Sequence, residues 1–453
     1  MGIVQCPGGF DLSVTPSASL PERNSSAPPT PATDEHPLAF AARIGSRFDV
    51  VGPLEAFDFP DKGNINRDTF VLRCGPSDDT SEFLLQRINQ QVFTRPDAVM
   101  AAMLASLHAQ RRSLNSDCAP EGCEWEVISL VSTREGAPYL MNEDRRGTTY
   151  WRLMHKISAC KTYKSLSEIT SRSEQLCVAE EAGRGLALYG DFTADMNIAG
   201  LVSPLPGYRV THLYYDQFES VLNGNRTLDD VSPLLPTDPV LRHSTEEHFM
   251  LHLTAGEFAK RSRDPDLQHF VELVRAEKAF ALTLEREMNS GGIRTVAIHG
   301  DTKLENFLFS TRTGRVKSLV DLDTIIAHTW LADWGDMVRS LANVAGEKEI
   351  DLTRVDVDME IYAAVARGFL RTAREVTEAE VALMTEAVEV IALELGLRFM
   401  TDYLRGDNYF KLSPADPPEL NKVRGMAQLT LFERLRKRSH ETKNCIRDLI
   451  SHL

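Results

Sequence analysis

Two neighbouring segments, residues 298–309 and 320–324, constrain the fold of this chain more than any other part of it. In each segment, apolar residues give way to polar side chains that crowd into a loop or a strand end. The residues between the segments, 310–315, are typical of a tight turn. The pattern therefore predicts a hairpin of two short strands, at residues 307–309 and 316–320.

The polar residues of the first segment are His299, Asp301 and Asn306, in the order H-x-D-x-x-x-x-N. Protein kinases have this spacing in their catalytic loop, where the aspartate accepts the proton of the attacking hydroxyl and the asparagine holds a metal ion. The predicted hairpin would bring Asn306 and Asp321 to the same end, beside Asp301. One metal ion could then contact both side chains.

Phosphoryl transfer requires a positioned hydroxyl, a base and Mg²⁺, and the protein takes little part in covalent chemistry. We expect Asp301 to be the base and Asn306 and Asp321 to be the metal ligands, because Mg²⁺ prefers oxygen ligands and keeps several waters. Lys303 is expected to meet the transferring phosphate as a point charge. Asp323 is either a second metal ligand or a structural acid. A chance hairpin with surface acids would explain an isolated His-Gly-Asp, but not the whole set.

These motifs resemble the aminoglycoside phosphotransferase and choline kinase superfamily. Within it, the chain looks most similar to the N-acetylhexosamine 1-kinases, through short stretches at residues 63–66, 85–89, 299–306, 321–324, 398–404 and 406–410. The resemblance implies an α+β, two-lobed, protein-kinase-like fold, with a small, mainly β N-terminal lobe and a large, mainly α C-terminal lobe. It also implies ATP and Mg²⁺ as cofactors and a small-molecule substrate.

The acceptor that this resemblance implies is the anomeric hydroxyl of a hexose or N-acetylhexosamine, giving the sugar 1-phosphate. Choline, homoserine or an aminoglycoside are alternatives within the superfamily. A nucleotide-binding pseudokinase is the alternative outside the enzymes.

The composition divides the chain into a tail and two lobes. Residues 1–38 are rich in Pro and Ser and are expected to be disordered. Residues 39–157 are expected to form the nucleotide-binding lobe, and residues 158–453 the catalytic and substrate-binding lobe. The sequence gives no indication of the oligomeric state.

The composition also restricts the partners of the chain. The net charge of −15 disfavours a nucleic acid or an anionic membrane as a partner, and there is no apolar run long enough to span a membrane. The seven cysteines are scattered and odd in number, which favours a reducing, cytoplasmic location.

The segment with Gly63, Asn64 and Asn66 is placed where a nucleotide-covering loop belongs, between strands predicted at residues 48–54 and 68–74. Glycine lets the backbone approach phosphate, and asparagine tolerates a tight turn. An ordinary hairpin turn would explain a single glycine equally well.

The next predicted strand, residues 82–89, departs from the kinase pattern. Gln86 stands where kinases have the lysine that holds the ATP phosphates, and the helix predicted from Pro96 to Arg112 has no glutamate to pair with such a lysine. We therefore expect Arg87 or the glycine-bearing backbone to hold the phosphates. The hinge that reads adenine through backbone groups is expected at Met154, His155 and Ile157.

The acceptor site is expected in the C-terminal lobe. Arg398 and Asp402 are four residues apart on a predicted helix, and could form a simple surface ion pair. With Tyr409 nearby, the resemblance favours a sugar site that contains all three, because a sugar needs forked donors and acceptors beside an aromatic wall. His212 is a further candidate for substrate contact, although a histidine at a helix start is more often structural.

Helices are predicted at residues 246–262, 266–289 and 420–438. Asp333 and Asp336 open another helix after the second motif. They are expected either to cap that helix or to brace the catalytic loop through its backbone amides.

Overall fold

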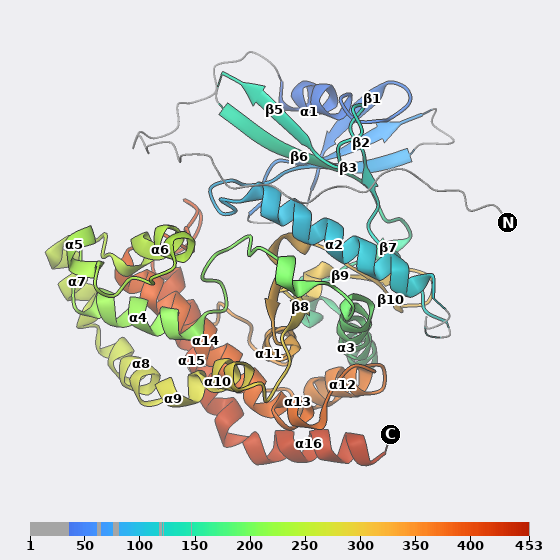
Figure 1. Cartoon of the computed structure of the whole chain (residues 1–453). Helices are drawn as coiled ribbons and strands as arrows, with labels where there is room; N and C mark the ends of the chain where they lie inside the picture. The colour runs from blue at the N-terminus through green and yellow to red at the C-terminus, as the bar shows by residue number, and fades with distance from the viewer. Residues whose placement is uncertain are drawn as a thin grey trace.

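The computed structural model describes residues 36–60, 65–75, 81–116, 120, 122–145 and 147–452. An antiparallel sheet forms the N-terminal region and a mainly helical part follows it, as Figure 1 shows. This arrangement confirms the predicted α+β, kinase-like architecture. Most of the predicted tail, and both Gly63 and Asn64, lie outside the described residues.

The N-terminal sheet has six strands in the order β1-β2-β3-β6-β4, and β5 pairs with β6 on the same edge as β4. Alternating and apolar side chains, such as those of Thr69–Cys74, make these segments good strands. The strands are β1 (Leu54–Asp58), β2 (Thr69–Cys74), β3 (Ser81–Arg87), β4 (Leu130–Val131), β5 (Leu140–Asp144) and β6 (Gly147–His155).

Two helices accompany this sheet. Helix α1 (Pro37–Gly45) packs on β1, and its residues Ala41 and Ile44 belong to the apolar cluster that covers one face of the sheet. Helix α2 (Pro96–Leu114) lies beneath the sheet in Figure 1 and packs against the helical part of the molecule. Proline at its first position suits a helix start, because that position lacks an intrahelical N–H bond in any case.

A small β unit connects the sheet to the helical part. The strands β9 (Phe307–Ser310) and β10 (Val316–Leu319) form the predicted antiparallel hairpin, extended by β7 (Cys160–Lys161). A second pair, β8 (Val296–Ile298) and β11 (Ile326–His328), flanks the polar motifs. The single-turn 3₁₀ helices η4 (Leu304–Asn306) and η5 (Leu322–Thr324) carry the motif residues themselves.

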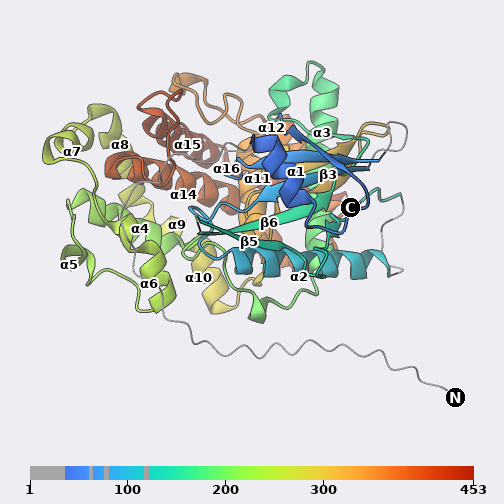
Figure 2. The same ribbon diagram turned by 90° about the horizontal axis from the view of Figure 1, so that it is seen from above.

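The rest of the chain is helical and shares the largest apolar core. Helices α3 and α12 pack together, as do α14 and α15. In Figure 2 the N-terminal sheet lies over α3, α11 and α12, whereas α4 to α8 lie to one side. The helices are α3 (Arg172–Thr193), α4 (Thr211–Leu222), α5 (Leu228–Val231), α6 (Pro239–Thr245), α7 (Ala255–Ser262), α8 (Pro265–Ala276), α9 (Lys278–Ala281), α10 (Thr283–Ser290), α11 (Trp330–Leu341), α12 (Met359–Leu370), α13 (Glu378–Ala382), α14 (Met384–Arg405), α15 (Leu420–Lys437) and α16 (Ser439–Ser451).

Several element boundaries differ from the predictions. Phe48 forms only an isolated bridge, and β1 begins at Leu54, the last residue of the predicted strand, and runs on to Asp58 in what was expected to be a loop. The long helices predicted over residues 246–262 and 266–289 are broken into shorter ones. Apolar spacing alone does not report such breaks, because the spacing can continue across the turns that separate the short helices.

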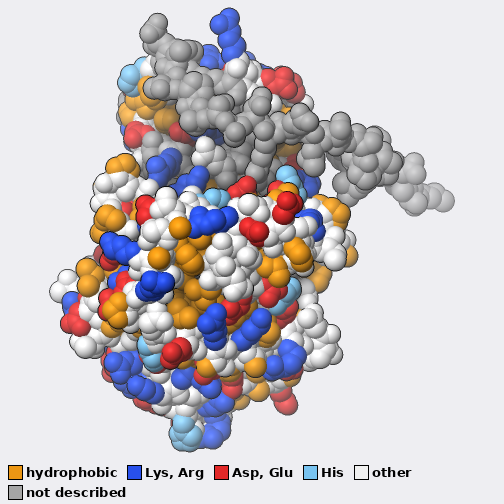
Figure 3. Space-filling view, turned by 90° about the vertical axis from the view of Figure 1, so that its left-hand side faces the viewer, with side chains coloured by type: hydrophobic (Ala, Val, Ile, Leu, Met, Phe, Trp, Pro, Cys, Tyr) orange, Lys and Arg blue, Asp and Glu red, His pale blue; other side chains and the backbone are white. Residues whose placement is uncertain are grey.

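The surface and the cysteines complete the description. On the face drawn in Figure 3, acidic and basic side chains are interspersed. Among the described residues, none of the helices combines the length and apolarity of a membrane crossing. Cys74, Cys123, Cys160, Cys177 and Cys445 are free thiols.

Candidate functional site

The two sequence motifs converge at one end of the β9–β10 hairpin. Asp301 lies in the loop that follows strand β8. The side-chain amide nitrogen of Asn306 donates to the backbone oxygen of Asp301 at 2.7 Å and to its carboxylate at 3.4 Å. The N–H of Val320 donates to the carbonyl of Asn306 at 2.9 Å, which places Asp321 at the same end of the hairpin. The expected proximity of Asp301, Asn306 and Asp321 is therefore present.

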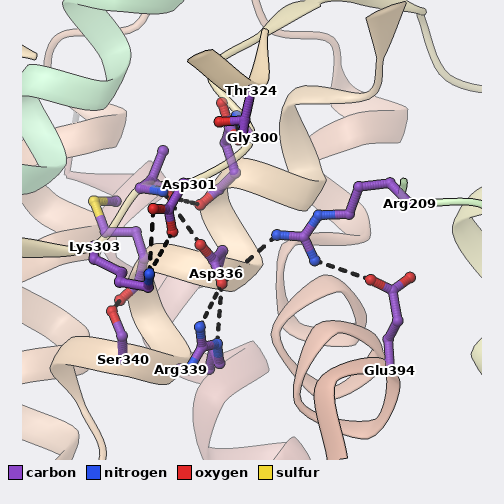
Figure 4. Close-up of polar contacts among 12 residues, drawn as sticks. Arg209, Gly300, Asp301, Lys303, Thr324, Asp336, Arg339, Ser340 and Glu394 are labelled. Carbon is purple, nitrogen blue, oxygen red and sulfur yellow. Dashed lines mark hydrogen bonds and ion pairs between the residues drawn. The ribbon is translucent and has the colours of Figure 1, made fainter. Parts of the chain in front are cut away.

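Lys303 forms an ion pair with Asp301, as Figure 4 shows. Its ammonium nitrogen is 3.0 Å from one carboxylate oxygen of Asp301 and 3.2 Å from the other. The negative charge of Asp301 raises the pKa of Lys303. Lys303 therefore stays protonated and holds the Asp301 carboxylate in one orientation.

Asp321 occupies an unusual backbone conformation, with φ 64° and ψ 57°, which aspartate tolerates better than most residues. One edge of its side chain is open to solvent. The protein atoms packed around the rest of its carboxylate, and then the charges of Asp323 and Asp301, raise its pKa to about 7. A bound cation would relieve this repulsion between neighbouring carboxylates.

Asp323 differs from Asp321 because both of its oxygens already have partners. It is buried, one oxygen accepts from Asn66 at 2.6 Å, and the other forms an ion pair with Arg152 of β6. This geometry is that of a structural acid rather than of a free metal ligand.

His299 and Gly300 connect the motifs through the backbone. The buried His299 ring accepts at Nδ1 from the N–H of Asp301 at 3.3 Å and contacts the Val320 carbonyl through Nε2 at 2.9 Å. The second contact requires Nε2–H, so the ring is the neutral tautomer, and burial lowers its pKa accordingly. Thr324 donates to the His299 carbonyl at 2.8 Å.

Asp333 and Asp336 of α11 hold the loop of residues 299–302 through its backbone N–H groups. Asp333 accepts from the N–H groups of His299 at 2.7 Å and Gly300 at 2.8 Å, and Asp336 accepts from that of Thr302 at 3.2 Å. The helix cap is Thr329 instead. Of the two readings left open by the sequence, the bracing role is therefore confirmed.

The two bracing carboxylates differ in charge environment. Burial raises the pKa of Asp333 to about 7, although its backbone donors oppose this. Burial would also raise the pKa of Asp336, but Arg339 and then Arg209 outweigh it and hold that pKa well below its usual range. Figure 4 shows Asp336 between these two arginines, with Arg209 extending to Glu394 at 3.0 Å.

A cluster of aromatic rings surrounds Arg398 next to this loop. Its guanidinium carbon lies between 4.9 and 5.5 Å from the centres of four rings, those of Tyr208, Tyr214, Tyr409 and Phe410. The hydroxyl of Tyr208 donates to the carbonyl of Gly300. The Arg398 cluster, meaning Arg398 with these four rings, therefore adjoins the loop that carries Asp301.

Asp402 supports this cluster without pairing with Arg398. It forms an ion pair with Arg405 at 2.9 Å and accepts from the N–H groups of Tyr409 and Phe410, each at 2.8 Å. Arg398 donates to the Tyr409 hydroxyl at 3.3 Å. Over the described residues, no carboxylate lies within ion-pair distance of Arg398, so the surface ion pair considered from the sequence does not form.

Two other predicted site residues lie in different surroundings. His212 pairs with Glu285 at 2.5 Å at the start of α4, and that hydrogen bond raises its pKa. Arg87 pairs with Asp68 at 2.5 Å on the exposed side of β3, opposite to Gln86 in the strand alternation. The structure does not bring either residue into contact with Asp301 or Asp321.

The expected hinge follows β6. The N–H groups of His155 and Lys156 donate to the Ser129 and Glu82 carbonyls at 2.8 and 3.0 Å. Met154 is paired within the sheet, with Leu84 and Leu130. Of the expected hinge residues, Ile157 alone lies beyond the strand, and its carbonyl accepts from the Cys160 thiol at 3.2 Å.

Three residues of this region were missed by the sequence analysis as site residues: Arg152, Tyr208 and His248. His248 packs edge-on against Tyr409, and burial lowers its pKa to about 3. A usable signal existed for Arg152, because it is the one charged residue within the apolar run Tyr150–Met154. Burying an arginine in a strand requires a partner, and this predicts a buried acid nearby.

Known proteins with a similar overall fold exist among solved structures. The structure of a microcompartment-associated aminopropanol kinase is similar, with 16% sequence identity, a TM-score of 0.51, and coverage of 88% of this chain and 98% of the other. A putative aminoglycoside phosphotransferase from Ralstonia eutropha JMP134 has 14% identity, a TM-score of 0.48, and coverage of 88% and 97%. At these identities the comparison concerns the fold.

The family itself is shown by sequence. The profile described as the phosphotransferase enzyme family matches residues 171–406, which is more than half of the chain and includes both motifs. The chain therefore belongs to the phosphotransferase enzyme family.

Proposed function

We propose that this protein is an ATP-dependent kinase that transfers the γ-phosphate to a hydroxyl of a small molecule. The observation that carries the proposal is the convergence of Asp301, Asn306 and Asp321 at one end of a single hairpin. These are the residue types that a kinase needs, a base and two oxygen ligands.

In this proposal Asp301 accepts the proton of the acceptor hydroxyl as the hydroxyl oxygen attacks the γ-phosphorus. The bond between the γ-phosphorus and the bridging oxygen breaks, and ADP leaves with that oxygen. Lys303 orients the Asp301 carboxylate through their ion pair and adds positive charge where the phosphoryl group carries negative charge. Asp333 holds the backbone on which Asp301 stands, so that the base keeps its position.

Asn306 and Asp321 would hold Mg²⁺. The fit rests on the donor set, one amide oxygen and one carboxylate, and on the mutual repulsion of the nearby carboxylates. Across the described residues there is no group of three His, Cys, Asp or Glu arranged for a metal. This agrees with an ion that takes few protein ligands and completes its shell with phosphate and water. When bound, Mg²⁺ would neutralise phosphate charge.

We further propose that the acceptor is a neutral or anionic hydroxyl compound, with the anomeric hydroxyl of a hexose or N-acetylhexosamine as the leading candidate. Arg398 has no carboxylate partner and already occupies the aromatic cluster in which a cationic amine would otherwise bind. Choline, amino alcohols and aminoglycosides are cations, and Arg398 would repel them. A sugar offers hydroxyl acceptors to Arg398 and a face to the tyrosine rings.

The test is ADP release from Mg-ATP over a panel of hexoses, N-acetylhexosamines, choline, homoserine, amino alcohols and aminoglycosides. Turnover with one sugar and an acid-labile phosphate product would support the proposed acceptor. Turnover with a cationic amine alone would refute the role given to Arg398 but keep the kinase assignment. ATP binding without turnover of any acceptor would favour a nucleotide-binding pseudokinase, which the glutamine at position 86 keeps as the second candidate.

A further inference from the structure

The nucleotide site lacks the ion pair that protein kinases use to hold the ATP phosphates. That pair consists of a lysine on the third strand and a glutamate on the following helix. Here β3 has Gln86 at the corresponding place, and α2 has no glutamate at all. A cation is nevertheless present beside Gln86, on the neighbouring strand.

That cation is Arg152 of β6, which lies directly opposite Gln86 in the register of the two strands. Its Nε donates to the side-chain oxygen of Gln86 at 3.0 Å, and its Nη1 contacts the sulfur of Met103 on α2 at 3.4 Å. Only 2% of the Arg152 side chain is exposed. A buried guanidinium is stable only with a carboxylate partner, and the partner of Arg152 is Asp323.

The contacts of Asp323 close a ring of polar side chains. Its second oxygen accepts from Asn66 at 2.6 Å. The hydroxyl of Thr69 donates to the Asn66 carbonyl at 2.8 Å and accepts from the Gln86 amide at 3.2 Å. We call this set of side chains the Arg152 ring; it consists of Asn66, Thr69, Gln86, Arg152 and Asp323. The ring joins the start of β2 and the strands β3 and β6 to η5. The ring thus ties the N-terminal sheet to the segment that follows the hairpin.

The ring is linked to the proposed metal ligand through the chain. Asp321 is two residues from Asp323 and sits in a left-handed conformation that its neighbours must hold in place. Arg152 also cancels the charge of Asp323. Without Arg152, Asp323 would be an unpaired buried carboxylate beside Asp321, free either to repel it or to compete for the cation.

We propose that Arg152 is a positioning residue of the nucleotide site, which acts through Asp323 and takes the place of the strand-lysine and helix-glutamate pair. The inference rests on the proposed function, because it assumes that Asp321 binds Mg²⁺ with ATP. In this proposal Arg152 orients Asp321 and attaches the sheet to η5. It does not contact the acceptor.

The test is calorimetric titration of the full chain with ATP, with and without Mg²⁺. The variants are Arg152→Met, Arg152→Lys and the exchange Gln86→Lys with Arg152→Gln, which moves the cation to the neighbouring strand. We expect Arg152→Met to weaken Mg-ATP binding by about tenfold or more, which corresponds to ~1.4 kcal/mol. Binding of ATP without Mg²⁺ should change less. The Lys variant and the exchange should each recover part of the loss.

Arg436→Met is the matched control, because it also removes an arginine from a nearly buried carboxylate, Glu389, which belongs to α14. A purely structural effect would lower the melting temperature of both variants and leave Mg-ATP affinity unchanged in both. If Arg152→Met does not fold, the exchange variant is compared with the wild type: a folded exchange variant whose Mg-ATP affinity lies within about tenfold of the wild type supports the inference, and a weaker affinity overturns it.

Three outcomes would overturn the inference. A folded Arg152→Met protein with wild-type Mg-ATP affinity would do so, and so would an exchange variant that folds but binds Mg-ATP no better than Arg152→Met. A wild-type protein that does not bind Mg-ATP at all would instead refute the proposed function, and this inference with it.

Discussion

The tight turn at Gly300 gives a prediction whose size follows from the structure. Gly300 has φ +86°, and a Cβ atom added to it would lie 2.4 Å from the carbonyl oxygen of Thr324. An L-residue in this conformation costs ~1–2 kcal/mol, and forcing the neighbouring backbone aside adds about 1–3 kcal/mol. We therefore expect Gly300→Ala to lower the free energy of unfolding by about 2–5 kcal/mol.

Gly314, in the turn of the β9–β10 hairpin, offers the matched control. It has φ +75°, but an added Cβ would meet nothing within 4 Å. Gly314→Ala should therefore carry only the conformational cost, about 1–2 kcal/mol. The assay is urea unfolding of both variants, followed by Mg-ATP titration. Because the Gly300 carbonyl also accepts from Tyr208, activity should fall in Gly300→Ala and persist in Gly314→Ala. Equal losses of stability in the two variants would refute the reasoning.

Three further predictions concern charge. Since the pKa of Asp321 is raised above its unfolded value, the folded state binds that proton more tightly. The stability contributed by this group is therefore present at low pH and is lost as the pH rises from about 4 towards 7. Unfolding curves measured over this pH range should show a smaller dependence of the free energy of unfolding on pH in Asp321→Asn than in the wild type. An unchanged dependence would contradict this prediction. Arg398→Met should raise the acceptor KM while leaving Mg-ATP affinity unchanged, as measured by steady-state kinetics and calorimetry; a lower Mg-ATP affinity with an unchanged acceptor KM would argue against the acceptor role. Arg209→Met should lower the free energy of unfolding in urea by about 3–5 kcal/mol, because it leaves the buried Glu394 without its arginine partner and removes an ion pair from Asp336. A decrease below about 1 kcal/mol would be that of an exposed ion pair and would contradict the prediction.

The residues around the hairpin show what the sequence could predict. The strands at Phe307 and Val316, and the meeting of Asn306 with Asp301, follow from local rules, because a tight turn and apolar alternation fix which residues meet. The bracing role of Asp333 was considered for a similar reason, its position in the first turn of α11. Contacts of short sequence separation are therefore predictable from the pattern.

The Arg152 ring shows what the sequence could not predict. Arg152 and Asp323 are 171 residues apart, and Asn66 and Asp323 are 257 apart. No local spacing brings such residues together, because the contact depends on how the whole sheet sits on η5. Asp402 is a second example. The i, i+4 spacing predicts an ion pair with Arg398. In the structure Asp402 instead pairs with Arg405 and accepts from the backbone N–H of Tyr409 in the turn that follows the helix.

The central claim is that Asp301 is the base of a phosphoryl transfer. It is tested most directly by Asp301→Asn, with phosphate transfer from Mg-ATP to the acceptor found in the panel as the readout. The account predicts that transfer falls by about 10²–10⁴-fold, as for the loss of a general base, while the melting temperature and Mg-ATP binding remain close to those of the wild type. Full transfer activity in a folded Asp301→Asn protein would contradict the account.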